Sequence, residues 1–166
     1  AFSKYGQLCV GIDPHAALLS DWCLSDDIAG LEKFASIALD SAVGRVGVIK
    51  PQVSFFERHG SAGFAVLEKL ATKAASTDVL VIMDAKRGDI GTTMDAYFDA
   101  WLGQNAPFLC DALTVSPYLG FESLSSTLSG CLERGKGLFV LAATSNPEGA
   151  KVQRATNGSE TIAAQM

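Results

Sequence analysis

Five short apolar runs alternate with longer amphipathic stretches along the 166 residues of the chain. A strand and a helix that repeat about every 30 residues predict parallel strands joined by right-handed helical crossovers. Each apolar run is short enough for a buried strand, and apolar residues recur at helical spacing between the runs. The expected strands are residues 8–12, 46–49, 79–83, 112–116 and 137–142, and the expected helices are 25–43, 61–75, 92–102 and 121–133.

Two α/β architectures have this pattern: an open doubly wound sheet and a (β/α)₈ TIM barrel. No GxGxxG sequence follows the first strand and no GxxxxGK[ST] occurs anywhere, so versions that bind a nucleotide cofactor lose support. Residues 157–159 resemble a turn with an N-cap, and residues 160–166 then begin a helix without a stop signal. Five strands cannot close an eight-stranded barrel. We therefore expect residues 1–166 to form a single α/β barrel domain, truncated at its C-terminus after about five βα units, and a complete small α/β domain is the alternative.

Composition excludes several classes of protein. Hydrophobic residues make up 48% of the chain and charged residues 19%, which is typical of a globular domain. The net charge is −5 with no basic cluster, which argues against nucleic acid as a partner. No apolar run reaches the roughly 18 residues of a membrane span, and the first residues of the sequence do not resemble a signal peptide. The four cysteines form no CxxC pair, and we expect them to be buried thiols of a cytoplasmic protein. The two histidines cannot form a histidine-based zinc site.

The most informative segment is DAKRGDIG at residues 84–91, which follows the apolar run 79–83. Side chains alternate faces along a strand, so Asp84 and Lys86 are expected to point the same way. Asp89 follows in the loop or the first helical turn and completes a D-x-K-x-x-D pattern. An acid and an amine at the carboxyl end of a buried strand occupy the place where α/β enzymes keep their chemistry.

Other polar residues recur where the predicted strands end. A parallel sheet brings these ends to one rim, so a functional cluster is expected there, with a structural ion-pair network or a Mg²⁺ site as alternatives. A lysine between two aspartates is held protonated and can act as an acid toward a developing carbanion. An aspartate beside it would repel a substrate carboxylate. The residues at the rim are Asp13, Lys50, Asp84, Lys86 and Ser145.

Four segments together resemble the orotidine 5′-monophosphate decarboxylase family, and the bacterial type-2 branch most closely. They are LCVGIDP at 8–14, IKPQVSFFE at 49–57, DAKRGDIGTT at 84–93 and TVSPYLG at 114–120. D-x-K-x-x-D alone is shared across a wider superfamily, whereas the four segments in this order are highly specific. The resemblance implies a dimeric (β/α)₈ barrel with active sites at the subunit interface. It also implies conversion of orotidine 5′-monophosphate to UMP and CO₂, the last step of de novo pyrimidine synthesis, without a metal or organic cofactor.

The resemblance assigns roles to individual residues. Lys50, Asp84, Lys86 and Asp89 match the family's Lys-Asp-Lys-Asp array, in which Lys86 would protonate C6 of the pyrimidine and Asp84 would lie against the departing carboxylate. Lys50 would bind a ribose hydroxyl and orient the array, and Asp89 would reach into the partner's site. The implied substrate-binding residues are Asp13 at the ribose, Thr93 across the interface with Asp89, and Ser145 at the pyrimidine amide edge.

Two other functions stay open. A sister enzyme on the same barrel, such as a Mg²⁺-dependent sugar-phosphate decarboxylase or hexulose-phosphate synthase, shares D-x-K-x-x-D but stabilises an enediolate with the metal. An inactive truncated paralogue could instead serve as a dimerisation module. The phosphate-gripping loop and arginine of the family would lie beyond Met166, so we expect residues 1–166 alone to be inactive.

Overall fold

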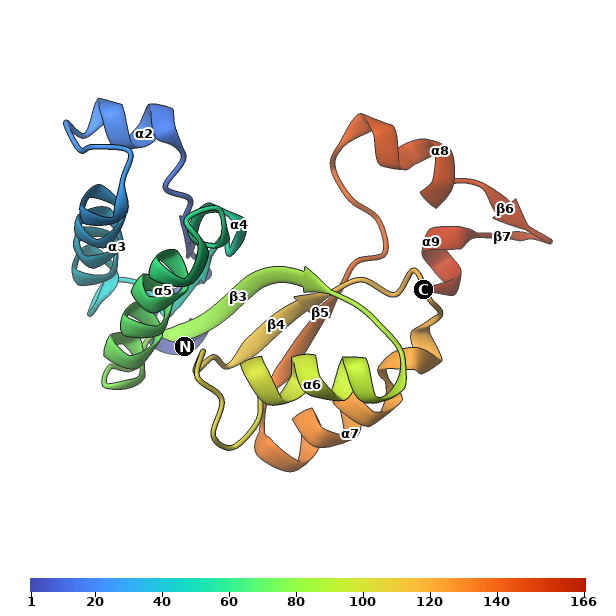
Figure 1. Ribbon diagram of the computed structural model, residues 1–166. Helices are drawn as coiled ribbons and strands as arrows, with labels where there is room; N and C mark the ends of the chain where they lie inside the picture. Colours follow the sequence, from blue (N-terminus) through green and yellow to red (C-terminus); the bar gives the residue numbers. More distant parts are fainter.

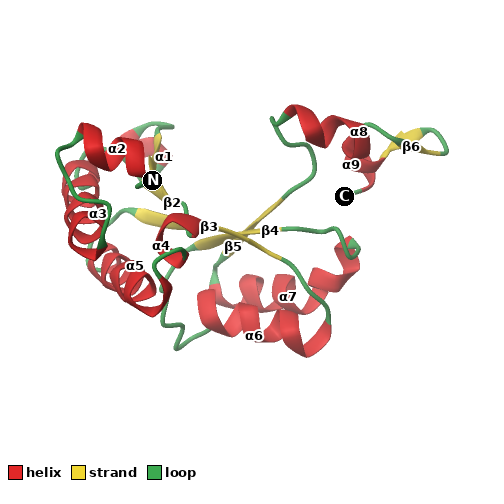
Figure 2. Cartoon of the chain, turned by 45° about the horizontal axis from the view of Figure 1, so that its top comes forward, coloured by secondary structure: helices red, strands yellow, loops and turns green.

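The computed structural model describes residues 1–166, and a five-stranded parallel sheet is its centre (Figures 1 and 2). Its strands lie side by side in sequence order, and each pairs in parallel with the next. A doubly wound sheet would reverse this order at a switch point. The prediction of about five βα units of a barrel is therefore confirmed. The strands are β1 (Cys9–Ile12), β2 (Val48–Pro51), β3 (Leu80–Arg87), β4 (Ala112–Val115) and β5 (Gly137–Val140).

Helices cover one face of the sheet, with α3 and α5 beside the first strands and α6 and α7 beside the last (Figure 1). The long helices agree with the predicted ranges to within three residues at each end, except that the last begins with a 3₁₀ turn, η1 (Phe121–Leu124). The short helix α2 was not predicted. The helices are α1 (Phe2–Tyr5), α2 (Ala16–Asp21), α3 (Ile28–Ala42), α4 (Ser54–Glu57), α5 (Gly60–Ala75), α6 (Gly91–Trp101), α7 (Ser125–Arg134), α8 (Ala150–Gln153) and α9 (Ile162–Gln165), with a second 3₁₀ turn, η2 (Pro147–Gly149).

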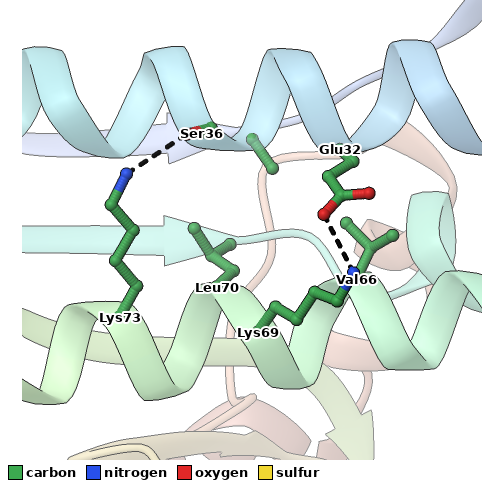
Figure 3. Close-up of a pocket in the computed structure, with 7 residues that line it drawn as sticks. Glu32, Ser36, Val66, Lys69, Leu70 and Lys73 are labelled. Carbon is green, nitrogen blue, oxygen red and sulfur yellow. Dashed lines mark hydrogen bonds and ion pairs between the residues drawn. The ribbon is translucent and has the colours of Figure 1, made fainter.

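The hydrophobic core lies between the sheet and these helices. Alternate strand residues point into it, as the two-residue period of a strand requires, and Ile49, Met83 and Leu113 are fully buried there. On the outside, α3 and α5 lie side by side over a shallow hollow of about 110 Å³ (Figure 3). Lys69 pairs there with Glu32 across the two helices, and this exposed pair adds little to stability.

The opposite face of the sheet is open in this chain. It borders a cavity of about 520 Å³ whose lining is mainly apolar and includes Cys9, Leu80 and Phe139. Leu80 is 43% exposed and Phe139 is 53% exposed, although both lie in strands. The face that the helices do not cover is therefore apolar along most of the strands and polar at their carboxyl ends.

The expectation that all four cysteines are buried was wrong for two of them. Cys110 and Cys131 are buried, but Cys9 faces the open cavity and Cys23 lies exposed between α2 and α3. All four are free thiols. The error at Cys9 arose because an apolar run was read as buried on both faces, whereas β1 is covered on one face in this chain.

The C-terminal segment differs from its prediction. Residues 156–157 (β6) and 160–161 (β7) pair as an antiparallel hairpin, and Gly158 takes a left-handed φ of 65° in its turn. The helix α9 begins after this hairpin, where the Thr161 hydroxyl accepts the Ala164 N–H, and not at Glu160 with Ser159 as its cap. Figure 1 shows this segment projecting away from the sheet. None of the helices combines the length and apolar character needed to cross a membrane.

Candidate active site

Asp84 is the centre of a charged cluster at the carboxyl end of the sheet. It lies in β3 and is 7% exposed. Lys50 in β2 donates to its Oδ2 at 2.8 Å, and Lys86 donates to its Oδ1 at 2.5 Å. The Thr114 hydroxyl in β4 also donates to Oδ1, at 2.9 Å. Three adjacent strands thus each direct a hydrogen-bond donor at one buried carboxylate.

The electrostatic balance at Asp84 favours the ionised form. Burial alone would raise the pKa of this carboxyl, because a charge is poorly solvated inside a protein. The hydrogen bonds from Lys50, Lys86 and Thr114 outweigh burial, and the pKa of Asp84 lies below its usual value. The cluster therefore presents two amines around a carboxylate that stays negative at neutral pH.

A β-bulge shapes the motif that contains Asp84 and Lys86. The ladder pairs Met83 with Leu113 and resumes only at Arg87 and Val115, so three residues of β3 lie opposite the single residue Thr114. Lys86 has a backbone φ of 49°, which residues other than glycine seldom adopt. The prediction that the side chains of Asp84 and Lys86 lie close together is confirmed. They meet at a β-bulge and not along a regular strand.

Residue Arg87 holds the bulge from the outer, helical side. Its guanidinium donates to Glu57 at 3.0 Å and lies 5.7 Å and 5.8 Å from the ring centres of Tyr97 and Trp101. Lys86 and Arg87 are neighbours in the chain, so the anchoring of one side chain among the helices fixes the start of the other. Both the carboxyl end of β3 and the direction of Lys86 depend on this arrangement.

The main chain of Asp84 is fixed as well. Its carbonyl oxygen accepts the Val53 N–H at 3.2 Å and the Gln52 side-chain amide at 3.3 Å. Gln52 also forms a parallel bridge with Asp84 beyond the end of β2. The segment that follows Lys50 therefore clamps β3 at the residue whose carboxylate forms the cluster.

The structure does not bring every predicted site residue into the cluster. Asp89 lies between β3 and α6 and forms no ion pair with Lys86, and its Oδ1 accepts the Ile90 N–H. Thr93 is exposed on α6, and Ser145 is exposed in the loop after β5. Asp13 follows β1 at the same edge of the sheet, and its enclosed Oδ1 has no hydrogen-bond partner. A lysine held between two aspartates is thus not observed within one chain, where the Lys86 amine forms an ion pair with Asp84 and none with Asp89.

Two residues of this site were not singled out from the sequence. Thr114 indicates only a strand by its residue type, because threonine is a common strand residue. Gln52 follows Pro51 and carried no charge to mark it. A signal was nevertheless present at Thr114, since it interrupts the apolar run of β4 with a hydroxyl beside the strand that holds Asp84 and Lys86.

The open cavity reaches this cluster, because Lys50 and Thr114 belong to its lining. The cavity therefore has an apolar surface along the strands and the Lys50 amine and the Thr114 hydroxyl at its polar end. No three acidic, histidine or cysteine side chains lie close enough together to hold a metal ion. The hollow between α3 and α5 is lined by residues of the outer helices and contains none of the cluster.

The chain is similar to known proteins along nearly its whole length. It is 56% identical to an orotidine 5′-phosphate decarboxylase of Streptomyces coelicolor over 95% of this chain and 57% of the relative. It is 54% identical to one of a Nocardioides species over 93% and 57%. A crystal structure from Streptomyces avermitilis, assigned as the same enzyme, superposes with a TM-score of 0.94 at 56% identity and covers 98% of this chain and 57% of that one.

The chain thus spans a little over half the length of the relatives it matches. The family model described as Orotidine 5′-phosphate decarboxylase / HUMPS matches residues 6–166. This match extends from before β1 to the end of the chain and contains every residue of the charged cluster. The fold, the cluster and these similarities agree, and the chain belongs to the Orotidine 5′-phosphate decarboxylase / HUMPS family.

Proposed function

We propose that the protein containing this chain decarboxylates orotidine 5′-phosphate to UMP and CO₂, the last step of de novo UMP synthesis. The observation that supports this most strongly is the buried carboxylate of Asp84 held between the amines of Lys50 and Lys86. The names of the relatives supply the substrate, and the cluster supplies a chemistry that suits it.

In this proposal the substrate carboxylate lies against Asp84. The bond between C6 and the carboxylate carbon breaks, CO₂ leaves, and the electron pair stays on C6. The Lys86 ammonium donates a proton to C6 to give UMP, and the neutral amine regains a proton from solvent. The fixed ammonium stabilises the charge at C6 without having to reorganise, which is the efficient form of electrostatic catalysis. Repulsion between Asp84 and the substrate carboxylate is relieved as CO₂ departs.

The other predicted site residues receive binding roles in the proposal. Lys50 orients Asp84 and binds a ribose hydroxyl, and Asp13 binds the ribose from the end of β1. Ser145 binds the amide edge of the pyrimidine. Asp89 and Thr93, which stay outside the cluster of their own chain, act in the site of a second subunit of a homodimer.

The deciding experiment follows the ultraviolet absorbance of orotidine 5′-phosphate with the complete gene product that contains this chain, in excess EDTA. We expect the orotate band to disappear with the wild type and to persist with Lys86→Ala. Lys69→Ala is the matched control, because Lys69 pairs with Glu32 on the outer helices, and it should retain full activity. A folded wild-type protein without turnover in EDTA would overturn the proposal.

A second candidate is a Mg²⁺-dependent sugar-phosphate decarboxylase or synthase. It is retained because the matched family model joins the pyrimidine enzymes with the HUMPS group. Turnover of a sugar phosphate that requires added Mg²⁺, without turnover of orotidine 5′-phosphate, would establish it. A protein that forms dimers and turns over neither substrate would instead be a non-catalytic dimerisation module.

The shared site can be tested by mixing two inactive variants, Lys86→Ala and Asp89→Ala. If each site uses Asp89 from the other subunit, a mixed dimer contains one site with both residues intact. Activity should then return after subunits exchange. Absence of recovery from demonstrably mixed dimers would show that Lys86 and Asp89 act from the same chain.

A further inference from the structure

The Thr114 hydroxyl connects the two principal groups of the cluster. It donates to Asp84 Oδ1 at 2.9 Å and accepts the main-chain N–H of Lys86 at 2.9 Å. Thr114 is 7% exposed and lies opposite the β-bulge, where it faces residues 84–86 alone. A single buried oxygen therefore holds both the carboxylate and the start of the lysine side chain.

Few side chains could make this connection. A hydroxyl is a donor and an acceptor at the same atom, whereas valine has the shape of threonine and neither function. Because the hydroxyl proton points to Asp84, the oxygen lone pairs remain available to the Lys86 N–H. The left-handed backbone of Lys86 is thus fixed by a hydrogen bond to the same oxygen that donates its proton to Asp84.

We propose that Thr114 is a positioning residue for the decarboxylation proposed above, and that its hydroxyl fixes the Lys86 main chain relative to the Asp84 carboxylate. The inference rests on that proposed function. Thr114 acts through Lys86 and Asp84, so its loss displaces the proton donor and not the substrate. A displacement of about 1 Å at a reacting group can reduce turnover by about 100-fold.

The groups around Asp84 define what a variant changes. Lys50 faces the carboxylate from β2, Lys86 from β3 and Thr114 from β4, and the Gln52 amide contacts only the main-chain oxygen. Thr114 is the uncharged donor among the three that reach the carboxylate. Its removal leaves both charged partners of Asp84 in the chain and takes away one of the hydrogen bonds that keep the pKa of Asp84 low.

The test compares wild type, Thr114→Val and Thr114→Ser in the complete gene product, with orotidine 5′-phosphate in EDTA. We expect kcat to fall by about 10- to 100-fold in Thr114→Val with a smaller change in KM. The acidic limb of the pH–activity profile should also move to higher pH. Thr114→Ser keeps the hydroxyl and should restore both properties. Thr127→Val is the matched control, because Thr127 is a buried threonine whose hydroxyl has no partner, and it should behave as the wild type.

Each outcome separates the inference from the proposed function. An active wild type together with a Thr114→Val variant of unchanged kcat and pH profile overturns the inference, as does equal loss in the valine and serine variants. If the wild type does not turn over the substrate, the proposed function fails. The positioning role is then judged by ¹³C NMR titration of Asp84, whose pKa must be higher in Thr114→Val than in Thr114→Ser. Should Thr114→Val not fold, Thr114→Ala removes the same hydroxyl and is judged by the same readouts.

Discussion

Gly88 lies against the main-chain carbonyl of Ser116, so that a Cβ at position 88 would be 2.4 Å from that oxygen. This contact brings the chain beyond β3 against the chain beyond β4, directly after the bulge that holds Lys86. A backbone oxygen cannot turn aside as a flexible side chain can. The close approach of the two segments therefore requires glycine at this position.

We expect Gly88→Ala to push these segments apart and to displace Lys86. Overpacking of this kind costs about 1–3 kcal/mol in the free energy of unfolding, and activity should fall at least about tenfold. Gly137→Ala is the control, because its Cβ would come no closer than 3.4 Å to any neighbour, the Ala112 Cβ. Chemical denaturation and the assay of the proposed decarboxylation, both with the complete gene product, measure the two effects. Equal behaviour of the two variants would contradict the prediction.

Lowering the pH should reduce the free energy of unfolding of the wild type more than that of the Asp84→Asn variant. The pKa of Asp84 is lowered in the folded state, so its ionised form stabilises the fold above the ordinary carboxyl pKa of about 4. That contribution disappears as the pH falls through the lowered pKa. The asparagine variant has no such titration. Unfolding free energies of both proteins, measured from pH 7 down to pH 3, should therefore converge toward low pH, and parallel curves would refute the assignment.

Arg87 and Arg134 provide a matched pair for the cost of exchanging arginine for lysine. Arg87 combines a Glu57 ion pair with two aromatic rings and is 22% exposed. Arg134 lies over Phe98 at 5.3 Å on the more exposed surface of α7. Lysine cannot reproduce the planar stacking, so Arg87→Lys should lose about 1–2 kcal/mol and Arg134→Lys distinctly less. Similar losses in thermal unfolding would show that Arg87 is no special anchor.

Thiol reactivity should distinguish Cys23 from Cys110. Burial raises the pKa of Cys110 to about 12, and its Sγ donates to the Trp101 main-chain oxygen at 3.0 Å. The thiolate is the reactive form, so Cys110 should react with a disulfide reagent only after unfolding. Cys23 is exposed and should react in the folded protein. Cys23→Ser should remove that reaction, and mass spectrometry of the labelled peptides would reveal any early modification of Cys110.

The sequence predicted the sheet well because its evidence was periodic. Five apolar runs with helical stretches between them leave few arrangements, and the carboxyl ends of parallel strands must share an edge. Lys50, Asp84 and Lys86 could be placed together for this reason. The bulge could not be predicted, because a two-residue period assumes a regular strand. The hydroxyl of Thr114 interrupts an apolar run, but threonine is so common in strands that this signal alone does not indicate a site.

Local signals were weaker where two of them competed. Asn157-Gly158 is a strong hairpin signal, and both Ser159 and Thr161 are good N-caps. The spacing predicts Ser159 as the cap, but Glu160 and Thr161 form the second strand of the hairpin, and α9 begins at Ile162. The helix α2 escaped notice because six residues contain less than two turns of apolar spacing.

Replacing Lys86 by alanine and by glycine should reveal the strain in its backbone. Both variants lack the amine, so their difference in stability reports the main chain. At an ordinary strand position glycine is less stable than alanine by about 0.5–1 kcal/mol. At a φ of 49° the order should reverse, whereas Lys50→Ala should remain more stable than Lys50→Gly. Chemical denaturation of the four variants measures which of alanine and glycine is more stable at each position. If alanine is the more stable at both positions, there is no backbone strain at Lys86.

At Lys86, the residue type that best suits the left-handed backbone differs from the residue type that the proposed chemistry requires. Glycine would suit the backbone there, yet it has no amine to donate a proton, so the residue that folds best cannot do the proposed work. The surrounding structure must supply the difference through Thr114, Arg87 and the clamp on Asp84. A consequence is that stabilising substitutions selected without regard to turnover should accumulate at position 86 itself, and those selected for turnover should accumulate in its supports.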